Sequence, residues 1–268
     1  MQQNLFTYKN SIISYYRFGK GDAVLVAFHG YGQTGQGYKY YEEVLTGRYT
    51  ILAIDFFWHG KSAWKEKEDF FEEDMKNIVL GIAKQEQLFA RKFSICSYSM
   101  GARMARALIR TFPERIERFI MIAPPTFQFN TFLNFTTNTA IGLWLFGYFI
   151  KNNLALLKLV KFLHKIKILN RSVYVFTSKF ICRKERLENV FKTWYAQRKL
   201  LTDFKLFSEL VNQNNIEIIL IAGNKDFITP PQKLIKYLGK IFNKKIFIIN
   251  HNHEFASSET KEIFVKNI

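Results

Sequence analysis

The chain has 268 residues, of which 48% are hydrophobic and 23% charged, and this composition excludes an intrinsically disordered or low-complexity protein. Its two cysteines exclude a disulfide-stapled secreted scaffold and a cysteine-rich zinc module. The net charge of +17 suggests an anionic partner, such as a nucleic acid, a lipid surface or an acidic small molecule.

The N-terminal residues have neither the basic region nor the apolar core of a signal peptide. The most apolar stretch, residues 140–150, has about one third to one half of the length that a membrane-spanning helix needs. We therefore expect a cytoplasmic protein. No group of histidine, cysteine and acidic residues has the spacing of metal ligands, so we expect neither a metal nor a cofactor.

Short, continuous apolar runs alternate with helical patterns along most of the chain. The apolar runs are residues 23–28, 50–54, 93–96, 119–123, 216–222 and 245–249. The helical patterns are residues 42–45, 69–87, 101–112 and 231–238. Apolar runs without alternation are typical of strands buried on both faces, and residues 5–8 and 11–17 suggest an antiparallel edge hairpin. We predict an α/β fold, with a mostly parallel sheet and helices on both faces.

Residues 126–205 interrupt this alternation. They contain no convincing buried strand, and their apolar and basic residues are interleaved at helical spacing. They hold 14 basic and three acidic residues, a net charge of +11 out of the +17 of the chain. We therefore predict a core formed by 1–125 and 206–268 and a basic helical insertion at 126–205.

A serine-rich segment, Ser97-Tyr98-Ser99-Met100-Gly101, lies between the run at 93–96 and the helical pattern at 101–112. A nucleophile elbow needs this strand-to-helix context and small residues two places before and after the nucleophile. Ser97 and Gly101 meet that demand, although glycine is usual at the first place. The helix that begins here can direct the N–H of Met100 at a developing oxyanion. The alternative is an ordinary serine-rich turn.

A glycine-rich turn, His29-Gly30-Tyr31-Gly32, directly follows the first buried run. Such a turn allows backbone N–H groups to point back over the end of the sheet. The N–H of Tyr31 would then be the second donor of an oxyanion hole, and the alternative is a tight turn without a catalytic role.

Two further turns supply an acid and a base. Asp226 follows the run at 216–222, and His251 and His253 follow the last run. A serine hydroxyl needs a base, and a neutral imidazole needs a carboxylate to fix its tautomer. The order serine, aspartate, histidine, each after a strand, is the order that this type of sheet requires.

Taken together, these segments resemble the α/β-hydrolase superfamily. The matching pieces are FHGYGQ (28–33), IDFFWHGKS (54–62), CSYSMGARMA (96–105), APP (123–125), AGNKDFITP (222–230) and INHNHEF (249–255). They cover nearly all of the chain outside the insertion, which occupies the position of the family's cap. Trp58 stands where the family commonly has glycine.

The resemblance implies that Ser99 is the nucleophile, Asp226 the acid and His253 the base. His251 remains an alternative base, and Asp55 is the second choice for the acid. Serine at position 99 argues against haloalkane dehalogenase and epoxide hydrolase chemistry, because both use a carboxylate nucleophile.

Arg103 follows Ser99 by four residues, which places both on one helix face. The run from Tyr98 to Arg103 is similar to the elbow of the pyruvate-eliminating 2-succinyl-6-hydroxy-2,4-cyclohexadiene-1-carboxylate synthases, in which an arginine here helps to bind a substrate carboxylate. Ala102 replaces the second glycine of that elbow. The alternative is a surface arginine on the elbow helix. Aromatic residues of the insertion, among them Trp144, can line an apolar substrate pocket or pack the insertion on the core.

The function that this pattern predicts is hydrolysis of a carboxylic ester or thioester with an apolar acyl group, through a Ser-His-Asp triad and an acyl-enzyme, and the expected partner is a small-molecule acyl substrate. One alternative is a menaquinone-pathway lyase that uses the same triad, and another is a non-catalytic ligand-binding homologue. The basic insertion suggests peripheral contact with an anionic membrane. No recognised motif indicates nucleic acid binding, and the sequence leaves the oligomeric state open.

Overall fold

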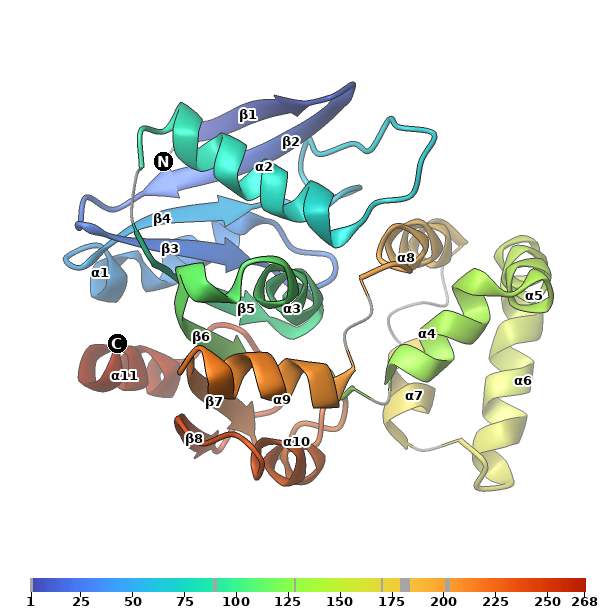
Figure 1. Ribbon diagram of the computed structural model, residues 1–268. Helices are drawn as coiled ribbons and strands as arrows, with labels where there is room; N and C mark the ends of the chain where they lie inside the picture. The colour runs from blue at the N-terminus through green and yellow to red at the C-terminus, as the bar shows by residue number, and fades with distance from the viewer. Residues whose placement is uncertain (1, 89–90, 128, 170, 179–183, 201–202) are drawn as a thin grey trace. The chain divides into compact units, whose positions relative to one another are not determined.

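The computed structural model describes residues 2–88, 91–127, 129–169, 171–178, 184–200 and 203–268. It divides into two compact units (Figure 1). The first, here called the sheet unit, comprises Met1–Phe127 and Lys199–Ile268, and the second, the helical unit, comprises Gln128–Arg198. The helical unit is shorter than the predicted insertion, because the segment after residue 203 forms a helix that contacts α3 (Ala102–Thr111) in the sheet unit.

Within the described residues, eight strands form a single sheet in the order β1-β2-β4-β3-β5-β6-β7-β8. In chain order, from β1 to β8, they are Gln2–Tyr8, Ser11–Phe18, Ala23–Phe28, Tyr49–Ile54, Phe93–Tyr98, Ile116–Ile122, Glu217–Gly223 and Lys244–Ile249. The predicted edge hairpin is confirmed, since β1 and β2 pair antiparallel and β2 continues antiparallel on β4. The pairings from β4 through β3 to β8 are parallel. The prediction of a mostly parallel sheet is therefore confirmed.

Helices cover both faces of this sheet, which explains why its central strands are apolar on both sides. In Figure 1, α2, α3 and α9 lie on one face, and α1 and α11 on the other. Their bounds are Glu42–Leu45 for α1, Glu72–Gln85 for α2, Phe204–Gln213 for α9, Pro231–Leu238 for α10 and Ser258–Asn267 for α11. Short 3-10 turns occupy Gly35–Tyr41 (η1), Ser99–Gly101 (η2) and Pro113–Arg115 (η3).

One cluster of core residues lies on the face covered by α1 and α11. Tyr41 and Phe264 pack there with a ring-centroid distance of 4.7 Å, and both contribute to a cluster that includes Leu25, Ile51 and Ile120 from the central strands. The predicted helices at 42–45, 69–87, 101–112 and 231–238 are present within a few residues. The helices α9 and α11 were not predicted.

The helical unit consists of α4 (Phe129–Asn138), α5 (Ala140–Lys151), α6 (Asn153–Lys165), α7 (Arg171–Phe176) and α8 (Lys184–Ala196). The hydroxyl of Thr139 accepts the N–H of Gly142 at 3.0 Å and caps α5. In the part of the chain that the structure describes, no single helix has the length and apolarity to cross a membrane. The pair α5–α6 passes that test only when taken together, and it is bent by 112°.

Candidate active site

Ser99 lies at the sharp turn that joins β5 to α3. Its φ angle is +46°, in the left-handed region that few residues other than glycine adopt. Such a conformation costs on the order of 1–3 kcal/mol and persists where the surrounding structure holds it in place. Ser97 and Met100 on either side are buried, whereas Ser99 is partly exposed. The turn thus presents the Ser99 side chain at the carboxyl end of the sheet, where open α/β sheets bind ligands.

The close approach of β3 to this turn explains its small residues. A Cβ at position 101 would lie 2.3 Å from the carbonyl oxygen of Phe28, and a Cβ at position 30 would lie 2.5 Å from the ring of Tyr98. Both distances are far below van der Waals contact, so glycine is required at both positions. The turn that contains Gly30 is thereby held beside Ser99.

His253, in the segment after β8, faces Ser99. Its Nε2 lies 2.9 Å from the Oγ of Ser99, and its Nδ1 lies 2.7 Å from the Oδ2 of Asp226. A carboxylate can only accept, so Nδ1 carries the proton and Nε2 presents its lone pair to the serine hydroxyl. The ring also packs on Tyr98, with centroids 5.4 Å apart. This is the tautomer that a general base for Ser99 requires.

The Asp226 side chain is fully buried in the turn after β7. Its Oδ1 accepts the backbone N–H groups of Ile228 and Thr229, each at 2.8 Å. Its Oδ2 accepts the Thr229 hydroxyl at 2.6 Å in addition to His253. Burial raises the pKa of Asp226, but the bonds from His253 and Thr229 outweigh it, and the pKa lies below its usual range. The carboxylate is therefore ionised and fixed in orientation at neutral pH.

His251 does not face the serine in this structure. Its Nδ1 lies 3.1 Å from a carboxylate oxygen of Glu254, and its Nε2 lies 3.5 Å from one of Glu259. The geometry thus brings His253, and not His251, together with Ser99.

Asp55 has a different set of partners. Its carboxylate accepts the hydroxyl of Ser14 and the backbone N–H of Gly35, each at 2.6 Å. Burial raises the pKa of Asp55, and those hydrogen bonds only partly oppose the rise. These contacts join β2, the loop after β4 and η1, so we assign Asp55 a structural role.

Tyr31 and Met100 flank the position of Ser99. Met100 is the second residue of η2, where a backbone N–H has no partner within the helix. Tyr31 directly follows Gly30, and a Cβ at Gly30 would lie 3.5 Å from the Cβ of Ser99. The segments that carry both predicted oxyanion donors therefore lie next to the serine.

Two buried histidines support the turn that contains Tyr31. His59 Nε2 accepts the N–H of Gly32 at 3.1 Å, and His29 Nε2 accepts the N–H of Phe56 at 3.0 Å. A backbone N–H can only donate, so each ring is neutral and carries its proton on Nδ1. The ring centroids of His29 and His59 lie 4.9 Å apart. Burial and the neighbouring His59 lower the pKa of His29 to about 3, and burial also lowers the pKa of His59.

The neutral state of His29 predicts a pH-dependent stability. Between pH 6.5 and about pH 3 the unfolded chain binds a proton here that the folded chain does not. This part of the stability is therefore present above pH 6.5 and is lost as the pH falls. We expect His29 to account for a loss of about 2 kcal/mol in the free energy of unfolding between pH 7 and pH 5.

Urea unfolding of the wild type and of His29→Asn at these two pH values measures this contribution. The asparagine amide can donate to the carbonyl oxygen of Gly30 in place of Nδ1, and it does not titrate. The variant should therefore lose less stability than the wild type on acidification. An equal loss in the two proteins would contradict the assignment.

Arg103 and Arg106 of α3 are buried, which corrects the alternative of a surface position for Arg103. Arg103 is only 3% exposed, and burial lowers its pKa to about 9, so it remains a cation at neutral pH. The neighbouring Arg106 donates to the carbonyl oxygen of Pro125 at 2.9 Å and lies 3.9 Å from the ring centroid of Phe127. Trp144 belongs to the helical unit, where its indole is exposed and stacks on Tyr148.

Thr229 and His29 are site residues that the sequence pattern did not single out. Thr229 was detectable as a hydroxyl three residues after Asp226, a spacing at which side chains commonly bond to a turn. His29 was detectable only as part of the segment HGYG. Among the described residues, no group of three or more histidine, cysteine or acidic side chains could hold a metal ion.

The comparisons with known proteins agree with this fold. A family model described as the alpha/beta hydrolase fold matches residues 23–259. The chain therefore belongs to the α/β-hydrolase family.

Among curated proteins, it is similar to the 2-hydroxy-6-oxononadienedioate/2-hydroxy-6-oxononatrienedioate hydrolase 1 of Pseudomonas putida. The two are 22% identical over 264 residues, which cover 94% of this chain and 88% of the relative. Among solved structures it is similar to MGS-M2, an alpha/beta hydrolase enzyme from a Medee basin deep-sea metagenome library, at 17% identity and a TM-score of 0.64, covering 98% of this chain and 95% of that chain. It is also similar to a thermophilic esterase from Thermogutta terrifontis, at 14% identity and a TM-score of 0.62, covering 99% and 94%.

Proposed function

We propose that the chain hydrolyses a carboxylic ester or thioester through a covalent acyl-enzyme on Ser99. The observation that carries this proposal is the continuous line of hydrogen bonds from the Oγ of Ser99 through His253 to Asp226. A hydroxyl aligned on an imidazole that a buried carboxylate orients is the arrangement that makes serine nucleophilic.

In the first half of the reaction, the Oγ of Ser99 attacks the carbonyl carbon while His253 Nε2 takes the hydroxyl proton. The negative charge that develops on the carbonyl oxygen is stabilised by the backbone N–H groups of Tyr31 and Met100. The bond to the leaving group then breaks, and His253 returns its proton to the leaving alcohol or thiol. The acyl group stays on Ser99.

In the second half, water takes the place of the serine hydroxyl. His253 removes a proton from the water as its oxygen attacks the acyl carbon, and the same two N–H groups stabilise the new oxyanion. The proton then returns to the Oγ of Ser99 as the carboxylic acid leaves. Asp226 stays ionised throughout and stabilises the imidazolium that forms in each half.

The comparisons support the reaction class and leave the substrate to the experiment. One similar structure is named an esterase, and the similar curated protein is named a hydrolase of dioates. The proposal therefore names hydrolysis at an acyl carbon, and the preferred acyl group is what the experiment below determines.

The experiment combines active-site labelling with turnover. A fluorophosphonate forms a bond to an activated serine oxygen and releases fluoride, and p-nitrophenyl esters of increasing acyl length report hydrolysis. We expect the wild type to be labelled and to hydrolyse esters with an optimum of chain length, and Ser99→Ala to lose both activities. The matched control is Ser97→Ala, which removes a buried hydroxyl two residues away and should keep labelling.

Three outcomes would overturn the proposal. Labelling that survives in Ser99→Ala would place the nucleophile elsewhere. Labelling of Ser99 without turnover of any ester would favour the pyruvate-eliminating lyase, with Arg103 as the candidate carboxylate ligand. A wild type that is not labelled at all would favour a ligand-binding protein.

A further inference from the structure

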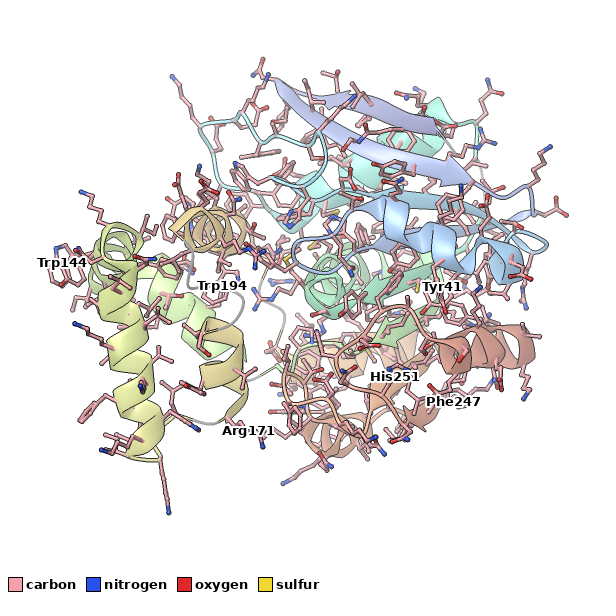
Figure 2. The ribbon with its side chains drawn as sticks, turned by 180° about the vertical axis from the view of Figure 1, so that it is seen from behind. Tyr41, Trp144, Arg171, Trp194, Phe247 and His251 are labelled. Atoms are coloured by element: carbon pink, nitrogen blue, oxygen red, sulfur yellow. The ribbon has the colours of Figure 1, made fainter. Side chains whose placement is uncertain are left out.

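The outer face of α5 exposes large apolar side chains. Ile141, Trp144 and Tyr148 follow one another at spacings of three and four residues, so they form one stripe along the helix. Ile141 is 65% exposed and Trp144 is 69% exposed. The Trp144 ring stacks on Tyr148 at 6.2 Å and projects from α5 away from the other helices of the unit (Figure 2). A stripe of exposed large apolar side chains along a helix indicates a contact surface.

The next helix, α6, exposes an apolar stripe beside a basic one. Leu159, Phe162 and Ile166 form the apolar stripe, and Phe162 is 57% exposed. The neighbouring stripe consists of exposed lysines and is formed by Lys158, Lys161 and Lys165. We call the exposed side chains of α5 and α6 together the α5–α6 surface.

The charged residues of the helical unit are predominantly basic. Residues 128–198 contain 12 basic and two acidic residues. No aspartate or glutamate occurs between Glu117 and Glu185. Both helices lie inside that interval, so no carboxylate near in the sequence can neutralise their lysines. The surface therefore has a strongly positive potential together with its exposed rings and aliphatic chains.

We propose that the α5–α6 surface docks the protein on an anionic phospholipid bilayer, independently of the proposed hydrolytic function. Tryptophan and tyrosine are enriched at the level of lipid head groups. Aliphatic side chains on the same face can enter the boundary of the acyl chains, while lysines extend their stems and keep the ammonium groups among the phosphates. Each lysine near an anionic surface strengthens binding.

The lengths of the helices indicate that they lie on the bilayer and do not span it. The helices α5 and α6 have 12 and 13 residues, or about 20 Å each, against a hydrocarbon core of about 30 Å. The bend of 112° between them prevents a continuous span. An orientation parallel to the interface allows exposed side chains of both helices to contact lipid.

The same observations disfavour two other occupants. A second copy of this surface would bring lysines of like charge together, which is unfavourable for an interface between identical faces. A nucleic acid would pair with the lysines and stack on Trp144, but it would leave the aliphatic side chains Ile141, Leu159 and Ile166 without a favourable contact. An anionic bilayer offers favourable contacts to the lysines, to Trp144 and to the aliphatic side chains.

Flotation of the full chain with lipid vesicles tests the proposal. We expect binding to vesicles of phosphatidylcholine with one third phosphatidylserine and weak binding to phosphatidylcholine alone. High salt should release the protein, because the Debye length falls from about 10 Å at 0.1 M to about 3 Å at 1 M. The tryptophan emission should shift to the blue on binding and be quenched by brominated lipids, and Trp144→Phe should reduce both changes.

Matched variants test whether binding depends on the α5–α6 surface itself, rather than on the net charge of the protein or on any exposed apolar side chain. Lys158→Gln, Lys161→Gln and Lys165→Gln combined should weaken binding to anionic vesicles by about a hundredfold. The same change at Lys233, Lys236 and Lys240, which are exposed on or just after α10, should weaken it far less.

Phe162→Ser should weaken binding to anionic vesicles by about tenfold. Phe242→Ser, at a ring that is 85% exposed in the sheet unit, should bind as the wild type does. Circular dichroism checks that each variant is folded, and quenching of the wild type by brominated lipids tests the proposal without any substitution.

Equal binding to neutral and anionic vesicles would overturn the proposal, and so would an equal effect of the two lysine triples. A dimer by light scattering that Phe162→Ser dissociates, without vesicle binding, would assign the surface to a second copy. Tight binding to a single-stranded oligonucleotide without vesicle binding would assign it to nucleic acid.

Discussion

Replacing His253 by alanine is expected to lower kcat/KM for an ester by about 10⁴-fold or more, with a smaller change in KM. The physical reason is the position of its Nε2, 2.9 Å from the Oγ of Ser99. Without that lone pair the hydroxyl proton has no acceptor, and the serine remains a weak nucleophile. Steady-state kinetics on the best p-nitrophenyl ester measures the loss.

His251→Ala is the matched control, since it removes the other imidazole of the same loop. His251 is partly exposed and contacts Glu254 and Glu259, outside the hydrogen bonds that join Ser99, His253 and Asp226. Its activity should therefore stay close to that of the wild type. The double variant Ser99→Ala/His253→Ala should be no worse than either single variant, because the two residues act as a unit. A large loss in His251→Ala with an active His253→Ala would reverse the assignment.

The fold could be predicted because the apolar runs, the helical patterns between them and the order of the motifs all indicated the same arrangement. Apolar runs such as 216–222 are typical of strands buried on both faces, and the helical patterns between them favour parallel pairing. The helix α9 was not predicted, and the predicted boundary between residues 205 and 206 falls inside its first turn. The packing of α9 against α3 places its first residues in the sheet unit as well.

The sequence predicted the type of site and the order of its residues, but periodicity alone could not give the geometry of every side chain. The order of Ser99, Asp226 and a terminal histidine follows from the topology. The choice between His251 and His253 depends on a turn of a few residues whose direction no periodicity reveals. The burial of Arg103 was also hidden, because helical periodicity alone does not show which faces of α3 other parts of the chain cover.

The basic character of the insertion was evident from composition, whereas its distribution over the helices was not. Composition cannot tell which face of α6 packs inward. In the structure Val160 is buried, and this leaves Phe162 and the lysine stripe exposed side by side. Aromatic residues of α5 that suggested a substrate pocket divide in the same way, since Phe146 is buried and Trp144 is exposed.

Asp226→Asn is expected to lower kcat/KM by about 10⁴-fold while leaving the protein folded. The backbone N–H groups of Ile228 and Thr229 both donate to the Oδ1 of Asp226. An asparagine would therefore keep its carbonyl oxygen there and turn its amide NH₂ toward His253. The NH₂ would donate to Nδ1 and leave the proton on Nε2, where the ring can no longer accept a proton from Ser99.

Asp55→Asn is the control, because it makes the same change at the second choice for the acid. Asp55 accepts from Ser14 and Gly35, so this variant should lose stability in urea unfolding and keep most of its kcat/KM when folded. Activity retained in Asp226→Asn and lost in Asp55→Asn would transfer the role of the acid to Asp55. If both variants lose only stability, the imidazole does not need a carboxylate to hold its tautomer, and the backbone around His253 must orient the ring instead.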